Sequence, residues 1–242
     1  EYYVNDAGNQ IEVLGESLYQ RYLEALGYDF DLEKIGYQGK DVKNIATKIA
    51  KDIKEKYVHD DSEDRKLYFK KVGRELELSK IKKDLDLYRV SFDHYQSELD
   101  LYKDGKVKNT LEALKNSGFT YDLDGALWLR TTDFGDDKDR VLIKSDGSYT
   151  YLLPDIAYHK DKFDRGYDHL INLFGADHHG YIIRLKAGLK ILGYNSDNLD
   201  IQIVQMVRLM ENGIELKMSK RTGNAITIRE LCEDVGVDVA RY

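Results

Sequence analysis

The chain has 242 residues, of which 42% are hydrophobic and 33% charged, and its formal net charge at pH 7 is −7. This balance is that of a globular protein with a sizeable core, and it excludes an intrinsically disordered chain. The acidic excess argues against non-specific coating of nucleic acid but not against a local basic site. A single cysteine, Cys232, excludes an internal disulfide and a four-thiolate metal site and favours a reducing, intracellular setting.

The first 30 residues predict a strand, a polar loop and an amphipathic helix. An apolar-aromatic run at residues 2–4 precedes polar residues 5–10, and Gly27 suits a left-handed helix end. Apolar residues recur between them at steps of three and four, as on one helical face: Ile11, Leu14, Leu18, Tyr22 and Ala25. The segment is interpreted as half of a βαβ unit whose first strand lies upstream of Glu1.

Residues 31–123 predict a mainly helical insertion inside an α/β domain. Lysines and acidic residues alternate along residues 40–56 and 65–86, with Ile and Leu at helical spacing. Because the charges are balanced within each segment, solvated helical faces are favoured over a nucleic-acid patch. No linker rich in Gly, Ser or Pro separates the segments.

From Asp124 the apolar period changes to two, which predicts strands at residues 126–130 and 140–144. Asp146 and Gly147 predict a tight turn, and Pro154 suits the first turn of a helix over residues 155–163. A buried strand is expected at residues 169–174 and a helix from residue 181 to Leu192, capped by Gly193.

A further strand at residues 201–210, a hairpin turn and a return strand at 214–216 follow. The last predicted helix, residues 228–235, holds Cys232 as a small buried hydrophobe. Alternating strands and helices at this spacing predict an α/β fold with a doubly wound, Rossmann-like parallel sheet.

The segment Lys217-Met218-Ser219-Lys220-Arg221-Thr222-Gly223-Asn224 predicts a mobile cationic loop. Two ammonium groups three residues apart could close over phosphates and stabilise the negative charge that builds on a departing pyrophosphate. For a bare pair of lysines at this spacing, the alternative is a solvated basic loop.

Residues 175–180, Gly-Ala-Asp-His-His-Gly, follow a predicted strand and open a helix. At such a junction backbone N–H groups point outward, and Gly175 would let a nucleotide approach the main chain. The alternative is the Asp-His-His cluster of manganese-dependent phosphoesterases. That cluster also needs aspartates at earlier strand ends, for which Asp6 alone is a poor match.

Tyr151 and Asp155 are four residues apart at a helix start, so that both can face one ligand. A carboxylate beside a phenol hydroxyl suits a guanidinium, which offers five donors in a planar fork. The alternative for Asp155 is an acid in the first turn that the helix dipole favours.

Three polar residues, Asn5, Asp6 and Gln10, follow the first strand, at the edge where doubly wound sheets bind ligands. Capping of the next helix by Asp6 is the alternative. The remaining histidines are expected to be ordinary surface or half-buried residues: His59, His94, His159 and His169.

Residues 217–221 resemble the Lys-Met-Ser-Lys-Ser/Arg signature of class I aminoacyl-tRNA synthetases. The likeness extends to one member family, arginyl-tRNA synthetase, over residues 1–10, 128–144, 149–159, 175–180 and 217–242. The string at residues 129–142, Leu-Arg-Thr-Thr-Asp-Phe-Gly-Asp-Asp-Lys-Asp-Arg-Val-Leu, is especially specific. The resemblance covers essentially the whole chain and is weakest over residues 40–90.

One family signature, His-x-Gly-His, is absent from the sequence. In the family it lies directly upstream of a segment like residues 1–10, and a helical anticodon-binding domain follows a segment like residues 237–242. The chain is therefore expected to be part of a catalytic domain that lacks its first strand and helix, and to be inactive by itself.

The resemblance implies ligation of arginine to its tRNA through an arginyl-adenylate formed from ATP. It implies that Lys217, Ser219 and Lys220 are catalytic and that Tyr151, Asp155 and His178 bind arginine. It also implies that ATP is bound by Gly175, Asp177, Met218, Asn5, Asp6 and Gln10. Mg²⁺ would accompany ATP as substrate, with no permanent cofactor and no protein metal site. The expected partners are arginine, ATP and arginine tRNA, in the cytoplasm and not at a membrane.

The resemblance implies four segments. Residues 1–30 form the start of the Rossmann catalytic domain, and residues 31–123 form the helical insertion. Residues 124–216 form the second part of the catalytic domain, and residues 217–242 form the basic loop and the following helix. A binding module of the same fold without catalysis is the alternative function.

Overall fold

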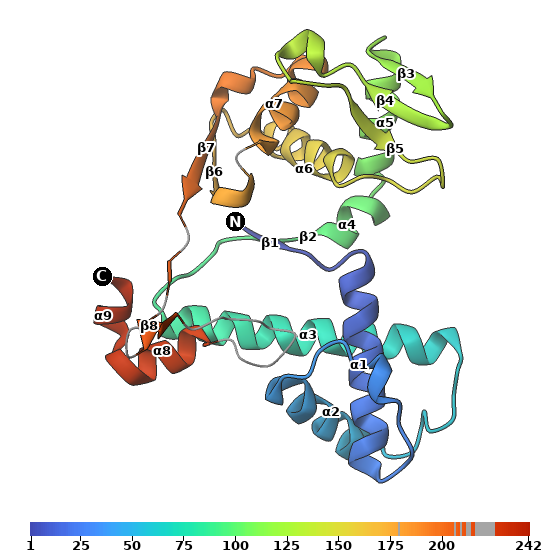
Figure 1. Cartoon of the computed structure of the whole chain (residues 1–242), viewed down its shortest axis with the longest axis vertical. Helices are drawn as coiled ribbons and strands as arrows, with labels where there is room; N and C mark the ends of the chain where they lie inside the picture. Colours follow the sequence, from blue (N-terminus) through green and yellow to red (C-terminus); the bar gives the residue numbers. More distant parts are fainter. Residues whose placement is uncertain (179, 206, 209, 212–213, 216–225) are drawn as a thin grey trace. The chain divides into compact units, whose positions relative to one another are not determined.

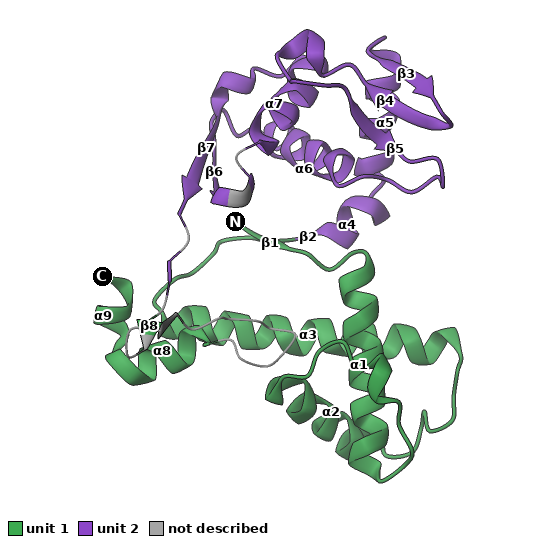
Figure 2. Cartoon of the chain, in the orientation of Figure 1, with its two compact units in different colours: residues 1–96, 209–242 green, residues 97–208 purple. Residues whose placement is uncertain are grey.

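The computed structural model describes residues 1–242 except 179, 206, 209, 212–213 and 216–225 (Figure 1). The chain forms two compact units: residues 1–96 together with 209–242, called unit 1, and residues 97–208, called unit 2 (Figure 2). Since unit 1 contains both ends of the chain, unit 2 is inserted between its two parts.

Three helices build the core of unit 1: α1 (Asn9–Leu26), α2 (Lys40–Ile53) and α3 (Glu63–Leu87). As predicted, α1 ends at Gly27, whose φ of 82° is left-handed. Leu18 and Tyr22 of α1 are fully buried in one cluster with Ile49 of α2 and Phe69 of α3. Ala25, which was predicted on this face, is exposed, because α2 and α3 leave it uncovered near the end of α1.

The rest of unit 1 is short strands and the last two helices. After α1 comes the 3-10 turn η1 (Leu32–Lys34), and β1 (Tyr2–Val4) pairs with β2 (Tyr95–Ser97). The predicted hairpin is present as β8 (Met210–Glu211) and β9 (Ile214–Glu215), although its turn lies outside the described residues.

Helix α8 (Ile228–Val235) matches the prediction, with Cys232 buried, and α9 (Val237–Arg241) follows it. Both attach to the end of α3 by polar contacts. The Arg229 guanidinium lies 2.7 Å from the Asp84 carboxylate, and the Tyr88 hydroxyl donates to the Ala240 carbonyl at 2.9 Å.

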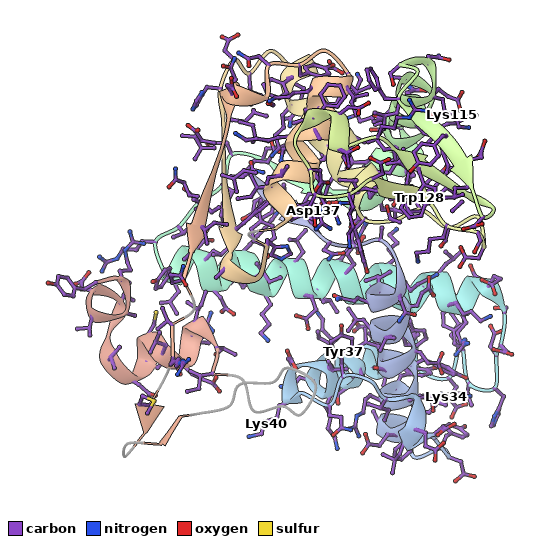
Figure 3. The ribbon with its side chains drawn as sticks, turned by 45° about the horizontal axis from the view of Figure 1, so that its top comes forward. Lys34, Tyr37, Lys40, Lys115, Trp128 and Asp137 are labelled. Carbon is purple, nitrogen blue, oxygen red and sulfur yellow. The ribbon has the colours of Figure 1, made fainter. Side chains whose placement is uncertain are left out.

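Unit 2 begins with α4 (Glu98–Lys103) and α5 (Lys106–Asn116), followed by an antiparallel sheet of β3 (Thr120–Leu123), β4 (Ala126–Leu129) and β5 (Arg140–Ile143). The sequence predicted β4 and β5 but missed β3. The missed signal was the Asp124-Gly125 pair, whose φ values of 53° and 75° suit a tight hairpin turn. Trp128 stacks on Tyr121 across this hairpin, with ring centroids 6.4 Å apart, and is a packing residue as expected (Figure 3).

The loop between β4 and β5 includes the 3-10 turn η2 (Thr132–Phe134) and is held by ion pairs. Asp136 accepts two hydrogen bonds from the Arg140 guanidinium, at 2.7 and 2.6 Å, and Asp137, labelled in Figure 3, pairs with the same guanidinium. Burial alone would raise the pKa of Asp136, but the bonds from Arg140 and Thr131 hold it below the ordinary value. Ion pairs and hydrogen bonds within residues 129–142 therefore stabilise this loop.

The second half of unit 2 is a parallel strand pair with two helices. It comprises α6 (Leu152–Asp164), β6 (Leu170–Gly175), the 3-10 turn η3 (Ala176–His178), α7 (Tyr181–Ile191), η4 (Ser196–Asn198) and β7 (Leu199–Val204). Pro154 lies in the first turn of α6 and Gly193 is left-handed after α7, both as predicted. Strands β6 and β7 run parallel, with Leu170 opposite Leu199 and Gly175 opposite Val204.

Two strand predictions need correction. The strand at 169–174 was expected to be buried, but only one of its faces is covered: Leu170 is buried, whereas Ile171 is 65% and Leu173 72% exposed. The strand predicted over residues 201–210 ends at Val204, and the described residues after it are exposed until β8 begins.

Candidate active site

The first turn of α6 presents the carboxylate for which the sequence predicts a cationic ligand. The Thr150 hydroxyl donates to the Val141 carbonyl at 2.6 Å and ties the start of the helix to β5. Pro154 occupies the first turn, where its missing N–H leaves no bond unmade. The Asp155 N–H donates to the Tyr151 carbonyl at 3.3 Å, so these two residues lie one turn apart.

The hydroxyl that contacts Asp155 belongs to Tyr181 at the start of α7, not to Tyr151. The Tyr181 hydroxyl donates to Asp155 Oδ2 at 2.5 Å and lies 3.4 Å from the Tyr151 carbonyl oxygen. The Tyr151 side chain is 80% exposed. Sequence reasoning missed Tyr181; the available signal was its position at the first turn of the helix that follows residues 175–180.

Asp155 lies in a site that is unfavourable for its charge. Burial raises the pKa of Asp155 above its ordinary value of 3.8, and the bond from Tyr181 and the nearby His178 and Lys162 oppose this rise. A carboxylate that has lost much of its hydration gains strongly from a cation that restores hydrogen bonds to it. The site therefore favours a cationic ligand.

The neighbouring helix α4 places a phenol group, that of Tyr102, near the Asp155 carboxylate. Burial, the Glu98 carboxylate, the Tyr149 phenol and the Asp155 carboxylate together raise the pKa of Tyr102 to about 12. The Tyr102 and Tyr149 rings stack with centroids 6.4 Å apart. Carboxylates and phenol groups thus surround the same small region of unit 2.

The end of β6 lies beside this region. The Phe174 ring contacts the rings of His178 and Tyr181, with centroids 5.7 and 6.5 Å away. Gly175 ends β6 and is exposed, so a flat ligand can approach its main chain. His178 and the end of β6 therefore lie near Asp155, while the ligand roles of Asp155, His178 and Gly175 stay predictions.

Some predicted residues lie outside what the structure describes. Asp177 lies in η3, but its side chain is not described, and residue 179 is not described at all. The four predicted residues of the basic loop also lie outside the described residues: Lys217, Met218, Ser219 and Lys220.

The three polar residues after β1 belong to unit 1. Asn5 and Gln10 are exposed. Asp6 does not cap α1, whose N-cap is Gly8 without a side-chain bond. Its carboxylate is buried and lies 3.1 Å from the Arg74 guanidinium, because it turns toward α3. The capping alternative is therefore wrong, while the ligand role stays a prediction.

His159 also differs from its expectation. His59, His94 and His169 are exposed, as predicted, but His159 is only 2% exposed. Its ring can be buried because both ring nitrogens have partners: the Asp155 carbonyl at 2.7 Å and the Asn172 amide at 2.5 Å. No feature of the sequence around residue 159 indicated these partners.

Among the described residues, no group of three or more His, Cys, Asp or Glu side chains could hold a metal ion. Chemically, the described part of the site offers a carboxylate and phenols for a cation and an exposed main chain at Gly175.

The family model described as "tRNA synthetases class I (R), catalytic domain" matches residues 3–241. The chain belongs to this family. The predicted α/β fold of a class I synthetase catalytic domain is thereby confirmed. The segment at residues 175–180 falls within the synthetase match, so nothing favours the phosphoesterase alternative.

Curated relatives in this synthetase family are similar over all 242 residues. "Arginine--tRNA ligase 1" from Halalkalibacterium halodurans is 56% identical and "Arginine--tRNA ligase" from Bacillus subtilis 53% identical. The chain spans 44% of the length of each. The match therefore covers less than half of the length of either relative.

Solved structures agree with this assignment. A crystal structure from Campylobacter jejuni that is assigned to arginyl-tRNA synthetase superposes with a TM-score of 0.87 at 38% identity, over 100% of this chain and 52% of that one. The Thermus thermophilus arginyl-tRNA synthetase gives a TM-score of 0.65 at 19% identity, over 96% of this chain and 44% of that one, and so supports the fold alone. No described helix of this synthetase-family chain is long and apolar enough to cross a membrane.

Proposed function

We propose that this chain is part of an enzyme that ligates arginine to its cognate tRNA. The observation on which this rests is a partly buried carboxylate, Asp155, whose pKa is raised by burial, within a class I synthetase (R) catalytic domain. Arginine is the amino acid whose planar guanidinium matches such a carboxylate. The names of the curated relatives support the same substrate.

In the proposed reaction, arginine is joined to the α-phosphate of ATP and pyrophosphate leaves; the arginyl group then passes to the terminal adenosine of the tRNA, with release of AMP. Asp155 would bind the guanidinium, with Tyr151 and His178 beside the same ligand. Gly175 and Asp177 would contact ATP, together with Asn5, Asp6, Gln10 and Met218. The protein contributes position and charge rather than a covalent nucleophile.

Lys217 and Lys220, with Ser219 between them, would stabilise the charge on the departing pyrophosphate. Mg²⁺ would arrive with ATP, held mainly by phosphate oxygens. Bound tRNA is expected to be required before arginine is activated, as the family likeness implies. We also propose the segment division at residues 30, 123 and 216, and a cytoplasmic location.

The test of arginine recognition is Asp155→Asn in the full-length protein. The amide keeps the shape but loses the charge, so the arginine KM should rise by about a hundredfold or more, as when a charged partner is removed. The measurement is tRNA-dependent pyrophosphate exchange, with Asp124→Asn at the exposed hairpin turn as matched control. An unchanged KM and kcat would refute the role of Asp155. If the unaltered full-length protein exchanges no pyrophosphate, the non-catalytic binding module is the better interpretation.

The test of the basic loop is Lys220→Ala in the same assay. Loss of charge stabilisation in the transition state should lower kcat by about 10²-fold with little change in the arginine KM. Lys217→Ala should act in the same way but more weakly, and Lys108→Ala, on an exposed face of α5, is the control. If KM rises while kcat is preserved, the loop binds substrate instead.

A further inference from the structure

A chain of hydrogen bonds connects the turn of α6 that holds Asp155 to strand β6. His159 Nδ1 lies 2.7 Å from the Asp155 carbonyl oxygen, and His159 Nε2 lies 2.5 Å from Asn172 Nδ2. Lys162 Nζ donates to Asn172 Oδ1 at 3.1 Å. Asp155, His159 and Lys162 follow each other at steps of four and three, so they share one face of α6. Asn172 is the member of the chain that comes from β6.

In this series of hydrogen bonds, the donor and acceptor of one bond determine the donor and acceptor of the next. A carbonyl oxygen can only accept, so His159 Nδ1 must carry a proton. An ammonium group can only donate, so Asn172 presents its oxygen to Lys162 and its amide N–H to His159. His159 Nε2 must then be an unprotonated acceptor. The arrangement therefore specifies one tautomer of a neutral imidazole, with every donor facing an acceptor.

Because His159 and Lys162 are buried, both need hydrogen-bond partners within the protein. His159 is 2% exposed and Lys162 is also buried, with its ammonium 4.0 Å from the centre of the Tyr158 ring. A buried polar group that loses a hydrogen bond destabilises the fold, because it cannot regain that bond from water. The amide of Asn172 bonds to two side chains of α6, and substitution by an apolar residue would remove one hydrogen bond from each of Lys162 and His159.

We propose that His159 and Asn172 are positioning residues that set the place of Asp155 relative to the end of β6. This rests on the proposed function, in which Asp155 binds the arginine side chain and Gly175 contacts ATP. Asn172 and Gly175 lie on the same strand, three residues apart, whereas Asp155 lies on α6. The series of hydrogen bonds links α6 to β6 near these residues. It therefore sets the distance between the bound guanidinium and the bound nucleotide.

The first experiment substitutes Asn172 in the full-length protein and measures tRNA-dependent pyrophosphate exchange. Asn172→Leu has nearly the same size but no polar atoms. It should raise the arginine KM by about tenfold, with the KM for ATP and kcat changed much less. A purely structural defect would lower the amount of active enzyme and so kcat, without moving KM. Asn116→Leu, on the exposed end of α5, is the matched control.

Asn172→Asp is the conservative variant. Its carboxylate can accept from Lys162 and from a doubly protonated His159, so the link remains and the arginine KM should stay within about threefold of the original value. An Asp variant as impaired as the Leu variant would overturn the proposal. So would an arginine KM that Asn172→Leu leaves unchanged in an otherwise active enzyme, and in that case the proposed function would still stand.

A spectroscopic measurement tests the chain independently of activity. With ¹⁵N-labelled histidine, His159 should show a protonated Nδ1 and an unprotonated Nε2, and Asn172→Asp should add a proton at Nε2. His159→Phe identifies the signal by its loss. The opposite tautomer in the unaltered protein would overturn the proposal. If the protein shows the expected tautomer but never activates arginine, the proposed function fails while the hydrogen-bond chain itself is supported.

Discussion

Two opposing effects act on the charge of Asp155. It lies in the first turn of α6, where the helix dipole stabilises a negative charge, yet burial raises its pKa. The Tyr181 hydroxyl offsets part of this cost by donating to Oδ2. The bond from Tyr181 and the nearby His178 and Lys162 therefore favour the ionised form against the effect of burial.

The pH dependence of arginine binding follows from this balance. Guanidinium binding needs the ionised carboxylate, and a raised pKa means that protonation begins at a higher pH than for an ordinary aspartate. The arginine KM should therefore rise as the pH falls through this raised pKa. Tyr181→Phe removes a bond that lowers the pKa, so it should shift the rise to still higher pH. It should also weaken binding by about 0.5–1.5 kcal/mol at neutral pH.

The measurement is the arginine KM across the acidic range in the full-length protein. Tyr167→Phe, an exposed tyrosine of the same unit, is the control and should leave the profile unchanged. A Tyr181→Phe profile displaced toward lower pH would contradict the assignment of Tyr181 as a donor to Asp155.

Residues that share a short motif could be predicted, and those joined only by the fold could not. The positions of Asp155 at a helix start and Gly175 at a strand end could be predicted from local spacing, and their ligand roles stay predictions. Tyr181 and Asn172 were missed because their contacts with α6 depend on how α7 and β6 pack against it. The burial of His159 depends on the same packing, because one of its partners, Asn172, lies on β6.

At the scale of elements, the packing of α6 against α7 decides whether Asp155 and Tyr181 meet. Gly188 of α7 faces Ile156 of α6, which is fully buried. A Cβ atom at position 188 would lie 2.3 Å from Ile156 Cδ1 and 2.7 Å from its Cγ1. The absence of a side chain at Gly188 therefore permits the close approach of the two helices.

Gly188→Ala should force these helices apart. Overpacking of this kind costs about 1–3 kcal/mol of unfolding free energy, and the arginine KM should rise because the bond from Tyr181 to Asp155 lengthens. Ile156→Val in the same protein removes one carbon and should restore part of both losses. Chemical denaturation and pyrophosphate exchange measure the two effects.

Gly180→Ala is the matched control, because no atom lies within 4 Å of the added carbon and φ is −70°. If Gly188→Ala were as stable and active as this control, the close packing of α6 and α7 would not matter for the site.

The elements themselves were predictable where one period dominates. The helical spacing in α1 and the capping pattern of α8 are local, and both helices were found at nearly their observed bounds. The strand β3 was missed because Asp122 and Leu123 are both exposed, so that polar and apolar residues do not alternate with burial along it. The end of β7 at Val204 was missed because the apolar run continues after pairing with β6 has stopped.

At the scale of the whole molecule, the predicted site residues are divided between the two units. Asp155, Gly175 and His178 lie in unit 2, whereas Asn5 and Asp6 lie in unit 1. The sequence did not reveal a boundary near residue 96, because neither composition nor a linker marks it. The segments predicted from the change of period near residue 124 remain a prediction about domains.

One face of the strand pair β6 and β7 carries three exposed apolar side chains. Ile171 and Leu173 of β6 are 65% and 72% exposed, and Val204 of β7 is 54% exposed. In the described residues the two strands form a sheet by themselves. Apolar sheet faces and free strand edges of this kind favour association with another chain.

We therefore expect a polypeptide of only these 242 residues to self-associate through this face. Each large apolar side chain that becomes buried contributes about 1.5–3 kcal/mol, so Ile171→Lys with Leu173→Lys should weaken association by at least about tenfold. Sedimentation velocity measures this, with Leu67→Lys on the exposed face of α3 as control. A polypeptide that stays monomeric would contradict this account of the exposed face.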